Sequence, residues 1–160
     1  MRYVVNTTVS IEKTQEEIRK LLRKYGSDGF GTSEEDREAT IGFRINGIRI
    51  RITAILPDRK EKRFVFTGKY GYTRTAEQQN KLYAQAIRQK WRVLLLTIKA
   101  KLEAVENQIV TLEEEFMPFI VTETGETIGE RLLPRLKAAQ AAGQSFRLLE
   151  ASTILEGELA

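Results

Sequence analysis

The longest regular pattern in the chain is a helical stripe inside Thr75–Phe116, a stretch that contains neither proline nor glycine. Apolar residues recur there at steps of three and four, the spacing of one face of an α-helix: Ile87, Trp91, Leu94, Ile98, Leu102 and Val105. Thr75 and Gln78 form a capping box that predicts the helix start, and Asn107 predicts its end or a kink. About 30 helical residues span roughly 45 Å, so we expect the other elements to pack on this helix.

The clearest local signal is an Asn46-Gly47 pair between two segments of alternating apolar and polar residues, Ile41–Ile45 and Ile48–Ile52. This combination predicts a β-hairpin closed by a type I′ turn. A two-residue turn sets the register, which places Ile45 opposite Ile48, Phe43 opposite Ile50 and Ile41 opposite Ile52. All six apolar side chains then share one face, which we expect to pack on the helical stripe.

The other face of this hairpin carries three arginines, Arg44, Arg49 and Arg51. Arg44 lies directly opposite Arg49 in the predicted register, and like charges in that position are destabilising. Bulk solvent, a carboxylate from elsewhere in the chain, or a bound phosphate would each offset the repulsion, and the sequence leaves all three open. Gly42, opposite Arg51, leaves room for the backbone of a ligand to approach.

The segments around the hairpin have weaker patterns. β-branched and aromatic residues predict short strands at Arg2–Val9 and Arg63–Thr67. An amphipathic pattern followed by Gly26 predicts a helix at Ile11–Tyr25. Ser27–Glu38 is polar and glycine-rich, and is therefore expected to be a loop.

After the central helix, two further capping boxes mark helix starts. Thr111 with Glu114 predicts a short helix through Phe116, and Thr127 with Glu130 predicts a final helix that ends before Gly143. The whole pattern predicts an α+β fold: an N-terminal strand and helix, an antiparallel sheet of three to four strands with the Asn-Gly hairpin, a long central helix and a C-terminal helical half. We place a single domain at residues 1–143 and a C-terminal tail at residues 144–160.

The composition narrows the chemistry by what is absent. The chain has no cysteine and no histidine, which excludes disulfides, thiolate nucleophiles and Ser–His or Cys–His catalysis within one chain. It contains no phosphate-binding glycine loop, dinucleotide fingerprint or calcium loop. We therefore predict no cofactor, no metal and no enzymatic activity. The longest apolar run is four residues, Val93–Leu96, so no membrane partner and a cytoplasmic location are expected.

Charge is unevenly distributed along the chain. Residues 1–101 hold 22 Lys and Arg against 11 Asp and Glu, whereas residues 102–160 hold 4 against 11. A basic first part indicates an anionic partner. The alternative is that the two parts pair with each other, within one chain or between chains, and we therefore expect a homo-oligomer, a dimer first of all.

Three groups of residues make up the predicted binding site. The first is the set of hairpin arginines, and the second is Arg88 and Arg92 on a basic face of the central helix. The third is the loop Gly68–Arg74, expected to lie between the other two, which combines cations with aromatic rings: Lys69, Tyr70, Tyr72 and Arg74. Such loops stack bases and hold phosphates. The alternatives are tyrosines packed at a domain edge and a helix face that is merely solvated.

Three segments together resemble a family of small proteins encoded by tailed phages and prophages: KTQEEIRKLLRKYGSDGF, WRVLLLTIKAKLEAVE and EEEFMPFIVTETGETIGERL. The resemblance covers most of residues 12–133 and carries over no site residue. It implies an accessory protein that acts in the cytoplasm of a bacterial host, in phage DNA metabolism or against host defence.

The leading prediction is a non-catalytic binder of phosphate-bearing ligands, nucleic acid rather than a small nucleotide. The alternative is a counter-defence protein that inhibits a host defence protein or sequesters a nucleotide signal. Sequestration would require the arginines to converge on an enclosed cavity with an aromatic wall such as Tyr70 or Tyr72.

Overall fold

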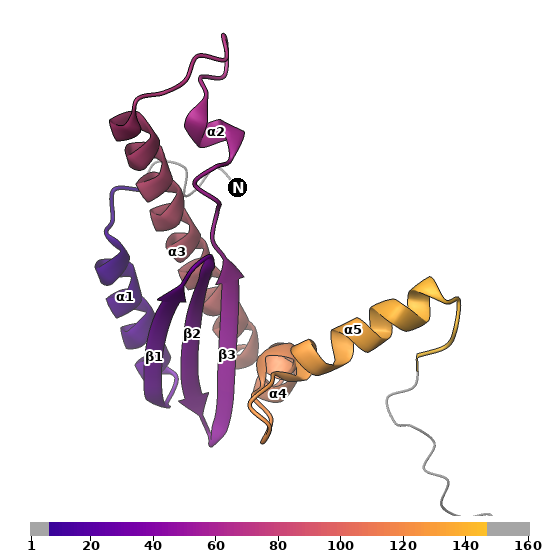
Figure 1. Cartoon of the computed structure of the whole chain (residues 1–160). Coiled ribbons are helices and arrows are strands. Elements are labelled where there is room, and N and C mark those ends of the chain that lie inside the picture. Colours follow the sequence, from indigo (N-terminus) through magenta and orange to yellow (C-terminus); the bar gives the residue numbers. More distant parts are fainter. Residues whose placement is uncertain (1–6, 147–160) are drawn as a thin grey trace, which may run out of the picture.

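A three-stranded antiparallel sheet packed on a long helix forms the centre of the protein, shown in Figure 1 as a computed structural model that describes residues 7–146. The sheet has the order β1-β2-β3. The elements in chain order are α1 (Ile11–Lys24), β1 (Ser27–Glu35), β2 (Glu38–Ile45), β3 (Ile48–Ile55), α2 (Lys62–Val65), α3 (Ala76–Glu106), α4 (Leu112–Phe116) and α5 (Ile128–Ala141). The predicted α+β fold with a long central helix is confirmed.

The central helix α3 begins and ends where the sequence predicts. The Thr75 hydroxyl accepts a hydrogen bond from the Gln78 backbone, the Gln78 side chain accepts one from the Thr75 backbone, and Asn107 is the C-cap. With 31 residues the helix is roughly 46 Å long. Its buried stripe consists of Ile87, Trp91, Leu94, Leu95, Ile98 and Leu102.

The hairpin β2–β3 has the predicted turn and register. Asn46 and Gly47 have φ of 50° and 78°, the positive values that a type I′ turn requires. Ile41, Phe43 and Ile45 pair with Ile52, Ile50 and Ile48. Five of these six side chains are buried in the core and Ile48 is half-buried against it, so the apolar face of the hairpin packs on the helical stripe as expected.

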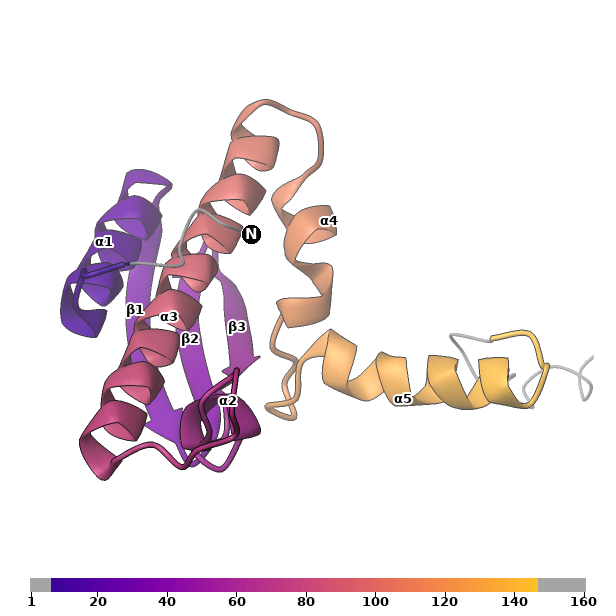
Figure 2. The same cartoon turned by 90° about the horizontal axis from the view of Figure 1, so that it is seen from above.

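Both α1 and α3 lie on the same face of the sheet (Figures 1 and 2). They pack against each other, and α1 also contacts β1. Within residues 7–146 no element covers the opposite face, and on that face lie the hairpin arginines. The sheet therefore presents one apolar face to the helices and one open, basic face.

The first strand was predicted to be a loop, and that prediction is wrong. Ser27–Glu35 pairs with β2 as an edge strand, with one irregularity between Ser27 and Gly29. Apolar alternation is absent because only one apolar side chain, Phe30, packs on the core from this strand. Backbone hydrogen bonds to β2, which no side-chain pattern reveals, stabilise the strand instead.

The predicted strand at Arg63–Thr67 is also wrong, because Lys62–Val65 forms the one-turn helix α2. Phe64 is buried, and its ring packs edge-to-face on Tyr83 of α3 at 5.7 Å between centroids. Phe66 makes one isolated bridge to Thr73. Of the predicted strand Arg2–Val9, residues 1–6 lie outside the described part of the chain and Thr7–Val9 form no strand.

The C-terminal half contains both predicted capping boxes, Thr111 with Glu114 and Thr127 with Glu130. Helix α5 extends away from the rest of the molecule (Figures 1 and 2). It starts tightly packed, because a Cβ on Gly129 would lie 2.7 Å from the carbonyl oxygen of Pro118. Most of the proposed tail, residues 147–160, lies outside the described residues. None of the helices described in residues 7–146 has the length and apolar character needed to cross a membrane.

Candidate nucleic-acid interface

The nine predicted site residues lie in three separate places. The hairpin arginines are on the open face of the sheet, near the β2–β3 turn, and the Gly68–Arg74 loop lies at the opposite end, beyond α2 (Figure 1). Arg88 and Arg92 lie on the side of α3 that faces α1. The Gly68–Arg74 loop does not lie between the hairpin arginines and the helix arginines. The chain leaves β3 at the end opposite the β2–β3 turn, and it carries the loop away from the hairpin arginines.

Carboxylates from elsewhere in the chain pair with two of the hairpin arginines. Arg44 Nε donates to Asp28 at 2.7 Å, and Arg51 donates to Glu130 on α5 at 2.6 Å. The hydrogen bond from Arg44 holds the pKa of Asp28 below its ordinary value. The pKa of Glu130 is also lowered, mainly by the Thr127 backbone amide and secondarily by Arg51. The like-charge repulsion predicted from the register is thus offset inside the chain.

Arg49 differs from its two neighbours. Among the described residues its side chain makes one hydrogen bond, 3.3 Å long, to the backbone carbonyl of Thr122, and it forms no ion pair. Beside it, Gly31 and Gly42 floor a shallow hollow of about 580 Å³ on the open sheet face. A Cβ at either glycine would meet nothing within 4 Å, so the hollow is open to a ligand.

The two helix arginines join α3 to its surroundings. Arg92 donates to Glu17 of α1 at 2.6 Å, with only 23% of the arginine side chain exposed. Arg88 donates to Gln85, but its Nε atom is buried and has no hydrogen-bond partner among residues 7–146. Arg92 therefore serves first to hold α1 on α3, whereas Arg88 has an unused donor.

The segment Phe66–Arg74, which we call the tyrosine loop, is an ordered hairpin. The Thr67 amide donates to the Tyr72 carbonyl at 2.8 Å, and the Arg74 amide donates to the Val65 carbonyl at 2.8 Å. The Thr67 hydroxyl also accepts from the Tyr72 amide at 3.1 Å. These bonds close the loop on itself without burying its tyrosine side chains.

The two tyrosines of the loop are exposed. Tyr70 is 68% and Tyr72 69% exposed, and their ring centroids are 6.0 Å apart. The Lys69 ammonium lies 5.5 Å from the centre of the Tyr70 ring. Phe66, at 39%, is the third large aromatic side chain exposed here. Packing at a domain edge, the alternative that the sequence left open, does not occur.

Cations surround the tyrosine loop. Residues 59–75 contain six Lys and Arg and one acid, Glu61, which pairs with Arg63 at 2.6 Å. Lys60, Lys62 and Lys69 are exposed and form no ion pair within residues 7–146. Lys60 and Lys62 belong to the charged run after Pro57, which the sequence shows plainly. The sequence did not indicate them as binding residues, because that role depends on their place beside the tyrosine loop.

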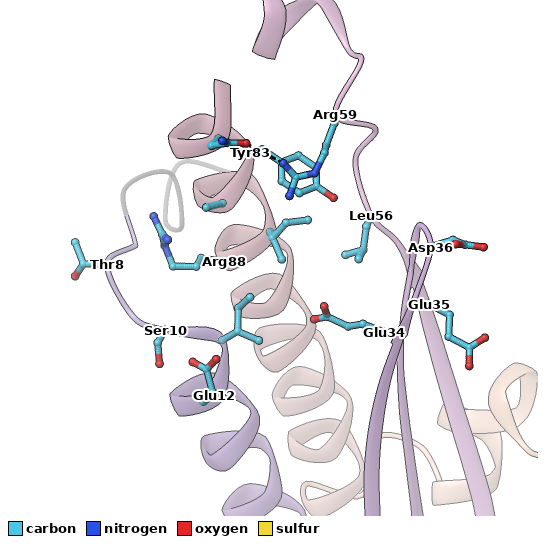
Figure 3. A pocket seen from close by; sticks show the side chains of 14 residues that line it. Thr8, Ser10, Glu12, Glu34, Glu35, Asp36, Leu56, Arg59, Tyr83 and Arg88 are labelled. Carbon is cyan, nitrogen blue, oxygen red and sulfur yellow. Dashed lines mark hydrogen bonds between the residues drawn. The ribbon is translucent and has the colours of Figure 1, made fainter. Parts of the chain in front are cut away.

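A pocket that sequence reasoning missed lies near the same end of α3 (Figure 3). Its volume is about 870 Å³, and it is enclosed by the start of α1, the end of β1, the Leu56–Arg59 segment and the first turns of α3. Arg59 stacks on the Tyr83 ring at 4.1 Å and donates to Asn80 at 3.0 Å. The lining residues are scattered over four segments, so no single stretch of sequence indicates the pocket.

Acidic groups line the lower part of this pocket. Glu34 accepts a 2.7 Å hydrogen bond from the indole of buried Trp91. The pKa of Glu12 is lowered by hydrogen bonds from its own backbone amide and from the Ser10 hydroxyl. Across residues 7–146, no three acidic side chains are arranged to hold a metal ion.

No family model matches the chain, and comparisons with curated proteins and with solved structures found no significant match. The function is therefore argued from the site itself.

Proposed function

We propose that this protein is a non-catalytic binder of single-stranded nucleic acid and that the tyrosine loop is its main contact. The observation that carries the proposal is the exposed pair Tyr70 and Tyr72, in a segment whose lysines Lys60, Lys62 and Lys69 form no ion pair among the described residues. Folded proteins seldom leave aromatic rings exposed side by side unless they bind something. Bases supply flat apolar partners, and their phosphates supply the charge that the lysines match.

The expected energetics follow from these two kinds of contact. Stacking on a tyrosine contributes about 1–3 kcal/mol per base and depends little on which base it is. Each phosphate that Lys60, Lys62 or Lys69 neutralises makes the affinity fall by about 0.7 log units per tenfold rise in salt. Binding is therefore strongly salt-dependent, and at the tyrosine loop it is largely independent of sequence.

The hairpin arginines provide a second, weaker contact for a longer strand. Exposed ion pairs such as Arg44–Asp28 are worth little in water, so a phosphate competes with the carboxylate for the guanidinium. Arg49 needs no such exchange, because its side chain pairs with no carboxylate among the described residues and bonds only to the Thr122 carbonyl. Arg92, bonded to Glu17, contributes least to binding.

We propose that this activity serves phage DNA metabolism in the cytoplasm of a bacterial host, as the resemblance to phage-encoded proteins implies. The runner-up remains a counter-defence protein. Its protein-inhibitor form predicts tight binding to one host protein and none to nucleic acid, which a pull-down from host lysate tests. Its sequestration form is less well supported, since Tyr70 and Tyr72 are exposed and the nine predicted residues do not converge on one cavity.

The test is fluorescence anisotropy with labelled single- and double-stranded oligonucleotides at two salt concentrations. We expect the single strand to bind at low salt and Tyr70→Ala/Tyr72→Ala to lower its affinity about tenfold or more. Ile109→Ala is the matched control, because Ile109 is 74% exposed at the far end of α3. Failure of the wild type to bind any oligonucleotide at low salt would refute the proposal.

A second variant separates the two surfaces. Arg49→Glu reverses a charge on the open sheet face without breaking an ion pair. We expect it to weaken binding of long strands and to leave short ones unaffected. A different result would be that Arg49→Glu abolishes binding of short strands whereas the tyrosine substitutions leave that binding unchanged. The protein would then still bind nucleic acid, but its main contact would be the hairpin arginines.

A further inference from the structure

The pocket at the start of α3 lies close to the tyrosine loop. Asn80 lines the pocket and stands five residues after Thr75, the N-cap of α3 that directly follows the tyrosine loop; five residues correspond to about 7.5 Å along the helix. The Gln79 side chain donates to the Arg74 carbonyl at 2.9 Å, and this hydrogen bond joins the end of the tyrosine loop to the start of α3. A strand stacked on the tyrosines therefore has its next nucleotides near the pocket mouth.

We propose that this pocket binds one unstacked guanine nucleotide of the strand held by the tyrosine loop. The inference rests on the proposed function and adds to it a preference for one base at one position. Its volume of about 870 Å³ lies within the usual range for sites that enclose a small organic group. The floor is apolar, formed by Leu56, Ala84 and Ile87 beside the Tyr83 ring, and suits the flat face of a base.

The cationic side of the pocket fits one phosphodiester. Arg59 is already oriented by its stacking on Tyr83 and its hydrogen bond to Asn80, and Arg88 stands on another wall of the same cavity (Figure 3). The Nε atom of Arg88 is buried and therefore closed to a ligand, so Arg88 contributes its charge. The exposed guanidinium of Arg59 is the donor for a phosphodiester oxygen.

The acidic side selects the base. Glu34 points into the cavity from the end of β1, whereas Glu35 and Asp36 point away from it (Figure 3). One Glu34 oxygen accepts from Trp91, and the other remains available as an acceptor. Guanine presents two neighbouring N–H donors on its Watson–Crick edge. Adenine, cytosine and thymine each place an acceptor beside their donor, and a carboxylate repels that acceptor.

The charge balance favours a nucleotide within a strand over a free one. Four acids, Glu12, Glu34, Glu35 and Asp36, and two cations, Arg59 and Arg88, line the cavity, so its lining carries a net charge of −2 and disfavours highly charged ligands. A phosphodiester adds one negative charge, whereas a free nucleoside monophosphate adds nearly two and a triphosphate more. The pocket is therefore matched to a base that arrives on a strand.

Trp91 provides the readout, because it is the only tryptophan in the chain and its indole is bonded to Glu34. The probes are four DNA ten-mers, all thymidine except for a single central dG, dA, dC or dT. We expect the dG oligomer to bind about tenfold tighter than the other three and to be the one that changes Trp91 emission. Glu34→Gln keeps an acceptor for the indole, and we expect it to lower the affinity for the dG oligomer to that for the dT oligomer. Glu35→Gln, which points away from the cavity, is the matched control.

Equal affinity for all four oligomers with unchanged Trp91 emission would overturn the pocket assignment and leave the proposed function standing. A dG preference that survives both Glu34→Gln and Arg88→Met would overturn it as well, because the preference would arise elsewhere. Loss of all oligonucleotide binding in the wild type would instead refute the proposed function, and the inference with it.

Discussion

Glu34 accepts the indole N–H of Trp91 at 2.7 Å, although 57 positions separate the two residues. Trp91 is fully buried at the centre of α3's apolar stripe. Its nitrogen needs an acceptor there, because a buried donor without one is destabilising. The end of the edge strand β1 supplies that acceptor, so one hydrogen bond joins the long helix to the sheet at the rim of the pocket.

Removal of this acceptor should destabilise the protein. We expect Glu34→Ala to lower the free energy of unfolding by about 1–3 kcal/mol, the range for a buried donor left unpaired. Glu34→Gln should have less than half that effect, because its amide oxygen still accepts the indole proton. Urea unfolding followed by Trp91 emission measures both. Equal stability of the Ala and Gln variants would show that water replaces the carboxylate.

The start of α5 should not tolerate a side chain at Gly129. Its Cβ would lie 2.7 Å from the backbone oxygen of Pro118, and a backbone atom cannot move aside as a flexible side chain does. We expect Gly129→Ala to destabilise α5 packing by about 1–3 kcal/mol, seen as faster amide exchange at Ile128, whose N–H donates to the Ile120 carbonyl. Gly31→Ala is the control, since its Cβ meets nothing within 4 Å, and should leave this exchange unchanged.

The phenol of Tyr25 should titrate unusually late. Its hydrogen bond to the Glu106 carboxylate, 2.6 Å long, is the largest of the causes that raise its pKa from 10.0 to about 12. A raised pKa means that this bond stabilises the folded state fully below pH 10 and that the contribution is lost as pH rises toward 12.

Phenolate absorbance, taken as the difference between wild type and Tyr25→Phe, gives the Tyr25 titration curve directly. Glu106→Gln should move that curve back toward 10.0, because the amide has no charge to oppose phenolate formation. A Tyr25 curve unaffected by Glu106→Gln would contradict the assignment.

Salt dependence should distinguish the two kinds of contact in the tyrosine loop. We expect Lys62→Gln and Lys69→Gln each to reduce the slope of log affinity against log salt by about 0.7, one phosphate contact. Tyr70→Ala should lower the affinity and leave the slope unchanged, because stacking releases no counterions. Lys20→Gln, an exposed lysine on α1, serves as the control. If Lys20→Gln reduced the salt slope equally, the slope would reflect the overall positive charge of the protein and not defined lysine–phosphate contacts.

The charge asymmetry should also affect association. Cations gather around α2 and the start of α3, whereas the C-terminal end of α3 and the first turn of α4 carry Glu103, Glu106, Glu113, Glu114 and Glu115. We expect the full chain to form a homodimer at low salt and to dissociate as salt screens the opposite ends. Light scattering at two salt concentrations measures this, and a monomer mass at both would exclude it.

Much of the fold could be predicted because the signals lie within a few residues of each other. Thr75 with Gln78 and Thr127 with Glu130 cap helices through neighbouring backbone amides. Asn46-Gly47 turns the chain and sets the whole register of β2 and β3. In each case the interaction partners are adjacent in the sequence, so their spacing was sufficient.

The wrong predictions concern segments whose structure depends on distant partners. Ser27–Glu35 has no apolar alternation and becomes a strand because β2 offers it a hydrogen-bonding edge. Arg63–Thr67 has the composition of a strand, but burial of Phe64 against Tyr83 favours one helical turn. Local propensity is too weak to withstand such tertiary contacts.

The sequence by itself determined the helical stripe, the hairpin and the presence of a loop that combines cations with tyrosines, because periodicity and turn chemistry act locally. Only the tertiary structure decided which charges remain available. Three arginines form ion pairs with carboxylates: Arg44 with Asp28, Arg51 with Glu130, and Arg92 with Glu17. Three lysines form none within the described residues: Lys60, Lys62 and Lys69. An ion pair between distant positions depends on where the backbone carries each side chain, and no spacing along the chain encodes that.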